Sequence, residues 1–326
     1  MIVTFLGTGS GAPTTRRNVS ALALRFEQTG KWWLFDCGEG TQHQLLRTPL
    51  KTSQLEKIFI THLHGDHLYG LIGLLASRSL RGGAPAGVTL YGPPGLDRYV
   101  QAIMEVSPVY LQYPLDIRIV SDGIIAEDEE RSVLCKRVRH RVPAFAYAVC
   151  EKDRPGSFRA DLAKEAGVPP GPLFGDLKRG ETVRLPDGRV VDGTKFTGPP
   201  QPGRKMVYSG DTEPCPELVE LAHGADLLIH EATYADPDRE LAKRSGHSTA
   251  REAAKLARAA QVKALCLTHF SPRYEKGEGL TLADLLAEAK EEFPDTLLAE
   301  DFATLQVKRN RVIKTTTYVT GDETLL

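Results

Sequence analysis

The sequence predicts an α+β fold in which two mixed β-sheets pack face to face and helices cover their outer surfaces. Two features predict it. The first half reads as a meander of short apolar strands separated by turns, and the second half alternates strands with helices. The 326 residues are 41% hydrophobic and 25% charged, which is ordinary for a globular protein and excludes a disordered or fibrous chain. This length corresponds to roughly two domains of about 150 residues, or to one large sandwich with an insertion.

The first half supplies most of the expected strands, as apolar runs bounded by Gly, Pro and polar turns. A helix is expected over Leu68–Leu80, because apolar residues recur there at roughly helical spacing. The expected strands are Ile2–Leu6, Leu22–Phe26, Trp32–Phe35, Lys57–Ile60, Val88–Tyr91, Ile117–Val120, Val133–Val138 and Ala146–Cys150.

The segment from about 152 to 204 differs from its surroundings. Gly and Pro crowd together at 167–172 and 198–203, and apolar periodicity is weak. We expect residues 152–202 to form an inserted flexible arm that leaves the core rather than a packed domain. The core then comprises residues 1–151 and 203–326.

Strands and helices alternate after this segment. Expected helices cover 216–222, 248–260 and Leu282–Glu292. The expected strands are Met206–Ser209, Leu227–His230, Ala264–Thr268, 303–307 and 312–319.

Composition excludes several classes of protein. The five cysteines are odd in number and form no C-x-x-C pair, so neither a disulfide framework nor a cysteine zinc cluster is expected. We therefore expect a reducing, cytoplasmic location. No apolar run approaches the roughly 18 residues that span a bilayer, and the first residues lack a basic region, so neither a membrane span nor a signal peptide is expected. The formal net charge of -1 excludes a globally basic nucleic-acid binder and leaves room for a local basic face.

One glycine-rich turn resembles a dinucleotide-binding fingerprint. Gly7–Ala12 fits a relaxed G-x-G-x-x-A pattern, but Pro13 follows and no helical pattern opens. No acidic residue lies about 20 positions further on, where the ribose would need it. We therefore expect no nucleotide cofactor and a tight turn at the edge of the site.

The strongest chemical signal is the loop Thr61–His67, which reads H-x-H-x-D-H at the end of a strand. Alternate residues of an extended loop point the same way, so His62 and His64 can share one metal ion. Gly65 permits a sharp turn that would send Asp66 and His67 to a second ion. Neutral imidazole and carboxylate are a typical ligand set for zinc.

Two ions need more ligands than one loop supplies, and three single residues at later strand ends provide them. His140, Asp211 and His269 each follow an apolar strand. A carboxylate can bind two cations with its two oxygens, which makes Asp211 the candidate bridge. The expected set is His62, His64, His140 and Asp211 on one metal, with Asp66, His67, His269 and Asp211 on the other. Asp36, also at a strand end, is a candidate acceptor that orients a ligand histidine.

These motifs resemble those of a known family. The H-x-H-x-D-H loop with three spaced single ligands resembles the metallo-β-lactamase superfamily. Further motifs resemble tRNase Z in its short form, the endonuclease that processes tRNA 3′ ends, and the resemblance runs over essentially the whole chain. These motifs are Phe35-Asp-Cys-Gly-Glu-Gly-Thr-Gln-His43, His230-Glu-Ala-Thr233, His247-Ser-Thr249, the Gly/Pro-rich segment 167–172 and Pro13-Thr-Thr-Arg-Arg-Asn18.

The resemblance implies a four-layer αβ/βα sandwich, two Zn²⁺ per subunit (with Mn²⁺ or another divalent ion as alternatives), a homodimer and precursor tRNA as substrate. It implies that His247, with Glu231 beside it, donates a proton to the leaving 3′-oxygen. Asp66, both ligand and nearest carboxylate, is the candidate general base. Thr15 stands where the family's PxKxRN loop has Lys, so a lysine contact from this loop is not expected. The expected substrate-binding residues are Arg17, Asn18, Ser248, Thr249, Gly171 and Pro172, the last two at the tip of the family's substrate-clamping arm.

Three alternatives remain at this stage. A thioester or lactone hydrolase of the glyoxalase II type would explain the metal ligands, but not the other motifs. A metal-stabilised RNA-binding module without turnover would leave the intact ligand set and His247 unexplained. A flavodiiron redox protein is less favoured still, because His64 stands where iron-binding relatives tend to have Glu. Cleavage of a 3′-extended tRNA with and without chelator separates these classes.

Overall fold

A computed structural model describes residues 1–80, 86–154, 156–275, 279–309 and 311–317. The chain divides into two compact units. Unit 1 comprises Met1–Asp128, Ser132–Cys150 and Arg204–Leu326, and unit 2 comprises Glu129–Arg131 and Glu151–Gly203. Among the described residues, no helix combines the length and the apolar character needed to cross a bilayer.

The first sheet of unit 1 has eight strands in the order β17-β16-β1-β2-β3-β4-β5-β6. Strands β1, β2 and β3 pair antiparallel, whereas β3, β4, β5 and β6 run parallel to one another. The strands are β1 Ile2–Gly7, β2 Ala21–Arg25, β3 Trp32–Phe35, β4 Leu55–Phe59, β5 Val88–Gly92, β6 Leu115–Ile119, β16 Ala303–Lys308 and β17 Arg311–Thr317.

The second sheet has seven strands in the order β15-β14-β13-β12-β9-β8-β7. Strands β12, β13, β14 and β15 are parallel, so their carboxyl ends meet at one edge. The strands are β7 Gly123–Glu127, β8 Arg131–Val138, β9 Ala144–Glu151, β12 Lys205–Tyr208, β13 Leu227–Glu231, β14 Leu265–Thr268 and β15 Thr296–Leu298.

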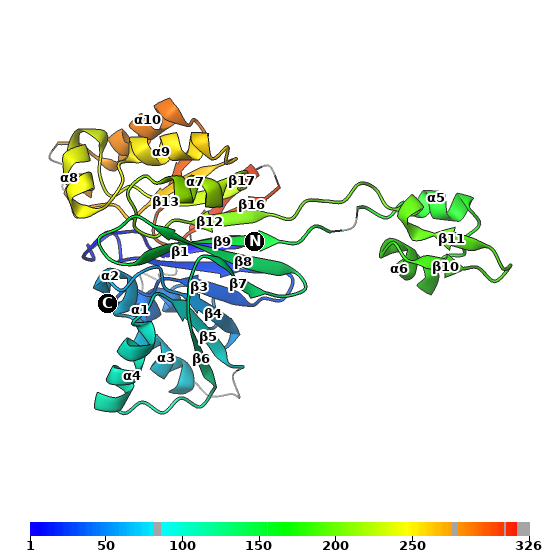
Figure 1. Cartoon of the computed structure of the whole chain (residues 1–326), viewed down its shortest axis with the longest axis horizontal. Helices are drawn as coiled ribbons and strands as arrows, with labels where there is room; N and C mark the ends of the chain where they lie inside the picture. The colour runs from blue at the N-terminus through cyan, green and yellow to red at the C-terminus, as the bar shows by residue number, and fades with distance from the viewer. Residues whose placement is uncertain (81–85, 155, 276–278, 310, 318–326) are drawn as a thin grey trace, which may run out of the picture. The chain divides into compact units, whose positions relative to one another are not determined.

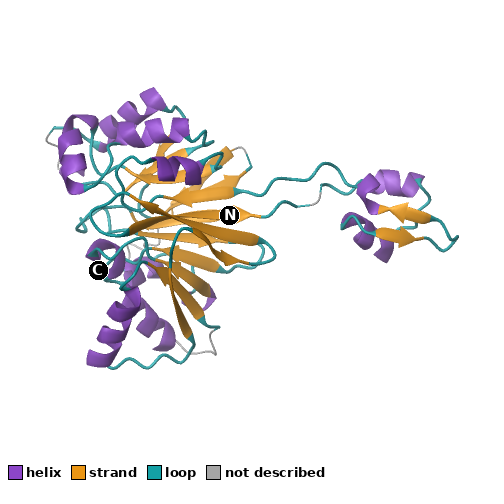
Figure 2. Cartoon of the chain, in the orientation of Figure 1, coloured by secondary structure: helices purple, strands orange, loops and turns teal. Residues whose placement is uncertain are grey.

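Helices lie on the outer side of each sheet, and Figure 2 shows the strands of unit 1 between the two groups of helices. In Figure 1, α1, α3 and α4 cover the first sheet, while α7, α9 and α10 cover the second. The helices of unit 1 are α1 Thr41–Leu46, α2 Gly65–Leu68, α3 Leu71–Leu80, α4 Leu96–Val106, α7 Pro216–Ala222, α8 Arg239–Ser245, α9 Ala250–Ala259 and α10 Leu282–Glu292.

Alternation along β3 explains how one strand serves two cores. Trp33 and Phe35 face the second sheet, whereas Trp32 and Leu34 pack under the helices that cover the first. Between the sheets, Phe35 stacks on Phe59 with ring centroids 4.9 Å apart. Tyr147 of β9 reaches Phe59 from the opposite sheet at 5.4 Å. Phe59 ends β4 and the Tyr147 hydroxyl donates to the Ile60 carbonyl oxygen, so this aromatic layer adjoins the loop that carries the histidine motif.

Unit 2 is folded around a small hydrophobic core of its own. It contains α5 Ala160–Glu165, α6 Pro172–Lys178 and a two-stranded sheet of β10 Thr182–Arg184 and β11 Val190–Asp192. Residues 152–202, expected to form a flexible arm rather than a packed domain, therefore contain a small packed core. The buried apolar residues of this core are Ala163, Val168, Leu177, Val183, Leu185 and Phe196.

Other differences have local causes. The helix expected over 68–80 begins only at Leu71, as α3, and Leu68 ends the short helix α2. Between them, Gly70 packs against Gly38 so closely that a Cβ would lie 2.1 Å from the Gly38 carbonyl oxygen. Strand β17 ends at Thr317, and residues 318–319 of the expected strand lie outside the described residues. Strands β7, β10, β11 and β15 and helices α1, α2, α4, α5, α6 and α8 were not predicted from the sequence.

Candidate metal centre

The histidine-rich loop follows β4 and begins the site. Its backbone is fixed by Asp36, whose Oδ1 accepts hydrogen bonds from the Thr61 amide at 2.8 Å and the Thr61 hydroxyl at 3.0 Å. After Ile60 the chain is extended through His64 and then turns into α2, which carries Asp66 and His67. The motif therefore occupies a strand end and a helix start, where its side chains point to one place.

Single residues from the second sheet complete the site. His140 follows β8, Asp211 follows β12 and His269 follows β14. Asp211 is reached through Gly210, whose φ of +59° and close approach to the Thr61 side chain favour glycine. The carboxyl ends of parallel strands meet at one edge of a sheet, which explains why residues far apart in sequence gather here.

The structure brings the seven expected ligands together as two groups that share Asp211. In each group the candidate ligand atoms lie within 4.8 Å of one another. Asp211 Oδ2 is 3.5 Å from His62 Nε2 and 3.3 Å from His67 Nε2, and its Oδ1 is 3.4 Å from His269 Nε2. The groups are His62, His64, His140 and Asp211, and Asp66, His67, Asp211 and His269.

Hydrogen bonds outside the groups hold the rings with one nitrogen facing inward. His67 Nδ1 lies 2.7 Å from the buried Asp36 Oδ2, and His140 Nδ1 lies 2.6 Å from the Gly246 carbonyl oxygen. Both acceptors lack protons, so each ring donates through Nδ1 and turns Nε2 toward the ligand group, where it can coordinate a metal. His64 presents Nδ1 instead, 3.0 Å from His62 Nε2.

The charges of the site fit divalent cations. Asp36, Asp211 and Glu231 are all buried, and Asp211 Oδ1 has no hydrogen-bond partner among the described residues. Burial lowers the pKa of His62 and of His64, which keeps these imidazoles neutral and able to coordinate. Burial opposes protonation of His67, but the carboxylates around it raise its pKa well above the usual value. The site thus requires positive charge, which metal ions would supply.

A carboxylate–histidine pair stands beside these groups. Glu231 ends β13, and its Oε1 lies 2.8 Å from His247 Nδ1 in the loop before α9. Burial alone would lower the pKa of His247, but the facing Glu231 carboxylate raises it to about 9. The ring centroid of His247 lies 5.0 Å from that of His140 in the first group and 5.4 Å from that of His269 in the second. The pair is therefore adjacent to both ligand groups.

The loop before β2 contacts Asp66. The Gly11 amide donates to Asp66 Oδ2 at 2.8 Å. Arg17 and Asn18, expected to bind substrate, are engaged within the protein: Arg17 donates to the Ala299 carbonyl oxygen at 2.8 Å and pairs with Glu275 at 2.9 Å. The Asn18 side chain donates to the Glu39 carbonyl oxygen at 2.8 Å. These contacts give both residues a role in holding the loop.

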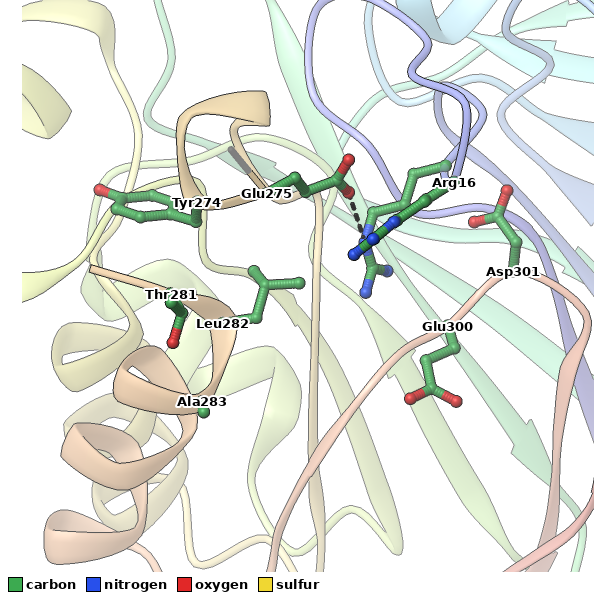
Figure 3. Close-up of a pocket in the computed structure, with 9 residues that line it drawn as sticks. Arg16, Tyr274, Glu275, Thr281, Leu282, Ala283, Glu300 and Asp301 are labelled. Atoms are coloured by element: carbon green, nitrogen blue, oxygen red, sulfur yellow. Dashed lines mark ion pairs between the residues drawn. The ribbon is translucent and has the colours of Figure 1, made fainter. Parts of the chain in front are cut away.

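An open cavity of about 470 Å³ adjoins this loop (Figure 3). Arg17 lines it together with its ion-pair partner Glu275, and Arg16 lies across from Leu282 at the start of α10. Asp301 closes one side and accepts hydrogen bonds from the Asn18 amide at 2.7 Å and the Thr8 hydroxyl at 2.6 Å. The cavity thus separates the loop from α10.

Ser248 and Thr249, also expected to bind substrate, are fully buried. The Ser248 hydroxyl donates to the Thr212 carbonyl oxygen at 2.6 Å. Thr249 caps α9 in a reciprocal arrangement with Glu252. The structure supports a role for both in fixing the position of His247. Gly171 and Pro172 are exposed at the start of α6 in unit 2.

Three residues that the sequence analysis did not single out hold the site together. Thr61 and Thr233 each place a hydroxyl between a carboxylate and a ligand histidine. Tyr208 reaches Asp36 from the second sheet. Thr61 adjoins the histidine loop and Thr233 closes the H-E-A-T motif, so sequence position is a signal for both. Tyr208 carries no such signal.

The chain is similar to proteins of known family. The model of the beta-lactamase superfamily domain matches residues 179–270, and that of the anti-Pycsar protein Apyc1 matches residues 1–98. A protein of Brevibacillus brevis named ribonuclease Z is 70% identical over 312 residues, covering 95% of this chain and 98% of that protein. The chain belongs to the ribonuclease Z family. Ribonuclease Z of Trichodesmium erythraeum is 54% identical over 95% of this chain and 96% of its own length.

The ribonuclease Z family also includes a solved structural relative. The crystal structure of human tRNase Z, short form, superposes with a TM-score of 0.67 at 33% identity and covers 94% of this chain and 100% of its own. The prediction of a metallo-β-lactamase-like sandwich is therefore confirmed, and so is the resemblance to short-form tRNase Z.

Proposed function

We propose that this ribonuclease Z family member is a metal-dependent endoribonuclease that removes the 3′ trailer from precursor tRNA. It hydrolyses one phosphodiester bond and leaves a 3′-hydroxyl on the tRNA and a 5′-phosphate on the trailer. The observation that carries this proposal is the position of His247, whose Nδ1 lies 3.9 Å from the shared ligand Asp211 and 2.8 Å from Glu231. A glyoxalase II-type thioester or lactone hydrolase is not favoured, because the 70% identical relative is named ribonuclease Z.

The two ligand groups supply imidazole and carboxylate donors, which bind zinc well. We propose two Zn²⁺ per subunit, with Mn²⁺ or another divalent ion as the alternative. One ion would be held by His62, His64, His140 and Asp211, and the other by Asp66, His67, His269 and Asp211. When bound, such ions supply Lewis acidity, which neutralises the negative charge that develops on the phosphodiester.

Two residues of the chain would move protons. Asp66 is the proposed general base, since its carboxylate accepts the Gly11 amide and is 12% exposed, so it can meet a water molecule. His247 is the proposed general acid. Its Nδ1 is held by Glu231, which leaves Nε2 to protonate the departing 3′-oxygen of the tRNA.

Unit 2 is the proposed substrate-binding arm, with Gly171 and Pro172 on its surface. Its arginines Arg159, Arg179 and Arg189 pair with acidic residues in their own neighbourhood. Other exposed cations of unit 2, among them Lys164, Lys178 and Arg184, make no ion pair within the described part of the chain. Because RNA affinity depends mainly on phosphate contacts, these three are the proposed contacts to the tRNA backbone.

Two further proposals rest on the family resemblance and on composition. We propose that the enzyme is a homodimer, which sedimentation measurements would test. We also propose that it acts in the cytoplasm, and the five cysteines, all free in the structure, support a reducing compartment.

Cleavage of a 3′-extended tRNA transcript, labelled at both ends, tests the function. The full-length protein should release an intact trailer with a 5′-phosphate, lose this activity with a chelator, and regain it with Zn²⁺ or Mn²⁺. Chelator-resistant cleavage would contradict the metal-dependent mechanism. Hydrolysis of S-lactoylglutathione without RNA cleavage would instead identify a glyoxalase II-type enzyme.

A further inference from the structure

The hydroxyl of Thr233 lies at the meeting point of the second ligand group and the catalytic pair. Its oxygen is 2.6 Å from Glu231 Oε2, 2.8 Å from His269 Nδ1 and 3.3 Å from His247 Nδ1. Thr233 is buried, so water does not replace these contacts. The two shorter contacts join a metal ligand to the carboxylate that holds His247.

The single hydroxyl proton of Thr233 determines the direction of its two shorter hydrogen bonds. A threonine hydroxyl has one proton to donate and two lone pairs to accept with. The ionised Glu231 carboxylate can only accept, so the 2.6 Å contact takes the hydroxyl proton. The 2.8 Å contact must then run from His269 Nδ1–H to the Thr233 oxygen.

This arrangement places the lone pair of His269 where a metal needs it. With the proton on Nδ1, the Nε2 atom is bare and lies 3.4 Å from both Asp66 Oδ2 and Asp211 Oδ1. The His269 backbone has φ of +61°, in the left-handed region that few residues other than glycine adopt. Thr233 is therefore the group that fixes the rotation and tautomer of a ring on a strained backbone position.

We propose that Thr233 is a positioning residue whose hydroxyl fixes the metal-binding tautomer of His269 and couples the second ligand group to the Glu231–His247 pair. The coupling to catalysis rests on the proposed function, whereas the effect on His269 does not. Glu231 keeps other donors without this hydroxyl, since the amides of Thr212 and Thr233 reach it at 2.9 Å and 3.2 Å. His269 Nδ1 has no other acceptor within the described residues.

Thr61 offers an internal comparison. Its hydroxyl contacts Asp36 and His62 Nδ1, each at 3.0 Å, so it performs the same relay for a ligand of the first group. Asp36, however, contacts the ligand His67 and no residue of the catalytic pair. Loss of the two hydroxyls should therefore have the same effect on metal binding and different effects on proton transfer.

The test uses Thr233→Val and Thr233→Ser in the full-length protein. Valine leaves a buried N–H of His269 without an acceptor, which favours the other tautomer and blocks Nε2. Zn²⁺ affinity, measured by competition with a chromogenic chelator, should fall about 10–100-fold for Thr233→Val. It should stay at the wild-type value for Thr233→Ser. Thr296→Val is the control, because Thr296 is buried and its hydroxyl donates to the Phe293 carbonyl away from the site.

Nitrogen-15 NMR of the histidine rings reports which ring nitrogen of His269 carries the proton. A purely structural role of Thr233 would leave this tautomer unchanged. In the metal-free wild type and Thr233→Ser, the His269 ring should carry its proton on Nδ1, and in Thr233→Val on Nε2. Wild-type Zn²⁺ affinity in Thr233→Val, or an unchanged His269 tautomer, would overturn the proposal. Equal loss in Thr233→Ser would also overturn it, because serine keeps the hydroxyl.

The coupling to catalysis is tested with zinc-saturated enzymes and two substrates. Thr233→Val should slow precursor tRNA cleavage more than hydrolysis of bis(p-nitrophenyl) phosphate, whose leaving group needs no proton. Thr61→Val should slow both equally. If Thr233→Val slows the two reactions to the same extent, Thr233 does not couple the second ligand group to proton transfer. A wild-type protein that does not cleave precursor tRNA would contradict the proposed function. The Zn²⁺ affinities and the NMR spectra would still test the role of Thr233 in fixing the His269 tautomer.

Discussion

The phenol of Tyr208 donates a 3.0 Å hydrogen bond to Oδ2 of Asp36. Tyr208 ends β12 in the second sheet, and Asp36 follows β3 in the first, so this bond joins the two sheets at the site. The same oxygen accepts from His67 Nδ1 at 2.7 Å. A cross-sheet contact and the orientation of a metal ligand therefore depend on one carboxylate oxygen.

Tyr208→Phe removes this contact and should lower both stability and metal affinity. A buried hydrogen bond to a charged acceptor contributes about 1.5–3 kcal/mol, and urea denaturation would measure the loss. Tyr147→Phe is the matched control, because that buried phenol donates to the Ile60 carbonyl oxygen at 2.7 Å and not to Asp36. The control should lose stability while keeping Zn²⁺ affinity. Equal loss of affinity in both variants would mean that Asp36 does not depend on Tyr208.

Asp211→Ala removes the one ligand that both groups share. Metal content should fall below two ions per chain and activity should be lost, because each group keeps only three ligands. Elemental analysis after dialysis measures the content. Asp226→Ala serves as control, since Asp226 is buried and pairs with Lys263 at 2.7 Å outside both ligand groups. Two ions in an active Asp211→Ala protein would show that this carboxylate is not the bridge.

His247→Ala should slow precursor tRNA cleavage about 10²–10⁴-fold, the usual contribution of general acid–base catalysis. Metal content should stay near that of the wild type, because His247 belongs to neither four-residue ligand group. Hydrolysis of bis(p-nitrophenyl) phosphate should fall much less. His43→Ala, at an exposed position of α1, controls for loss of an imidazole. If His247→Ala slows the hydrolysis of both substrates to the same extent, His247 is not the general acid.

Replacing residues 155–200 by a short Gly/Ser linker should remove precursor tRNA processing mainly through KM. The segment holds no proposed metal ligand, and a flexible loop closes at little entropic cost. Hydrolysis of bis(p-nitrophenyl) phosphate should therefore persist, because this substrate never reaches unit 2. Unchanged tRNA processing would exclude unit 2 as the substrate clamp. Combined loss of metal and of small-substrate activity would instead place the segment in the core.

The charge on unit 2 allows a finer test. The triple variant Lys164→Ala, Lys178→Ala and Arg184→Ala should weaken tRNA binding and flatten its salt dependence by about one unit of slope per lost phosphate contact. The triple variant Arg159→Ala, Arg179→Ala and Arg189→Ala changes net charge equally but removes cations that are already paired. Filter binding at several salt concentrations should show the smaller effect for the second set. Identical effects would mean that net charge alone attracts the RNA.

Residues with strong local signals were predictable from the sequence. Apolar runs that end in a candidate metal ligand predicted the histidine loop and the strands that precede Asp211 and His269. The fold class followed from the order of such runs. Helix α10 was located residue by residue, because its apolar and polar positions alternate with helical period.

Features that depend on distant partners were not predictable. The family resemblance implied that Arg17 binds substrate, but no sequence pattern indicated its partners Glu275 and Ala299 near the other end of the chain. Unit 2 was missed as a folded body because its core is built from a few apolar residues spread among turns. Strand β7 was missed because it is short and only Ile125 and Ala126 pack partly against the core, whereas its other residues are exposed.

Each ligand group draws side chains from both sheets. His62, His64, Asp66 and His67 follow β4 of the first sheet, whereas His140, Asp211 and His269 follow strands of the second. Bound ions would thus act as removable cross-links between the two halves of unit 1, and the halves could separate only after releasing them. A ligand that binds only the native state increases the free energy of unfolding. The concentration of available metal would then determine the lifetime of the folded enzyme as well as its catalytic rate.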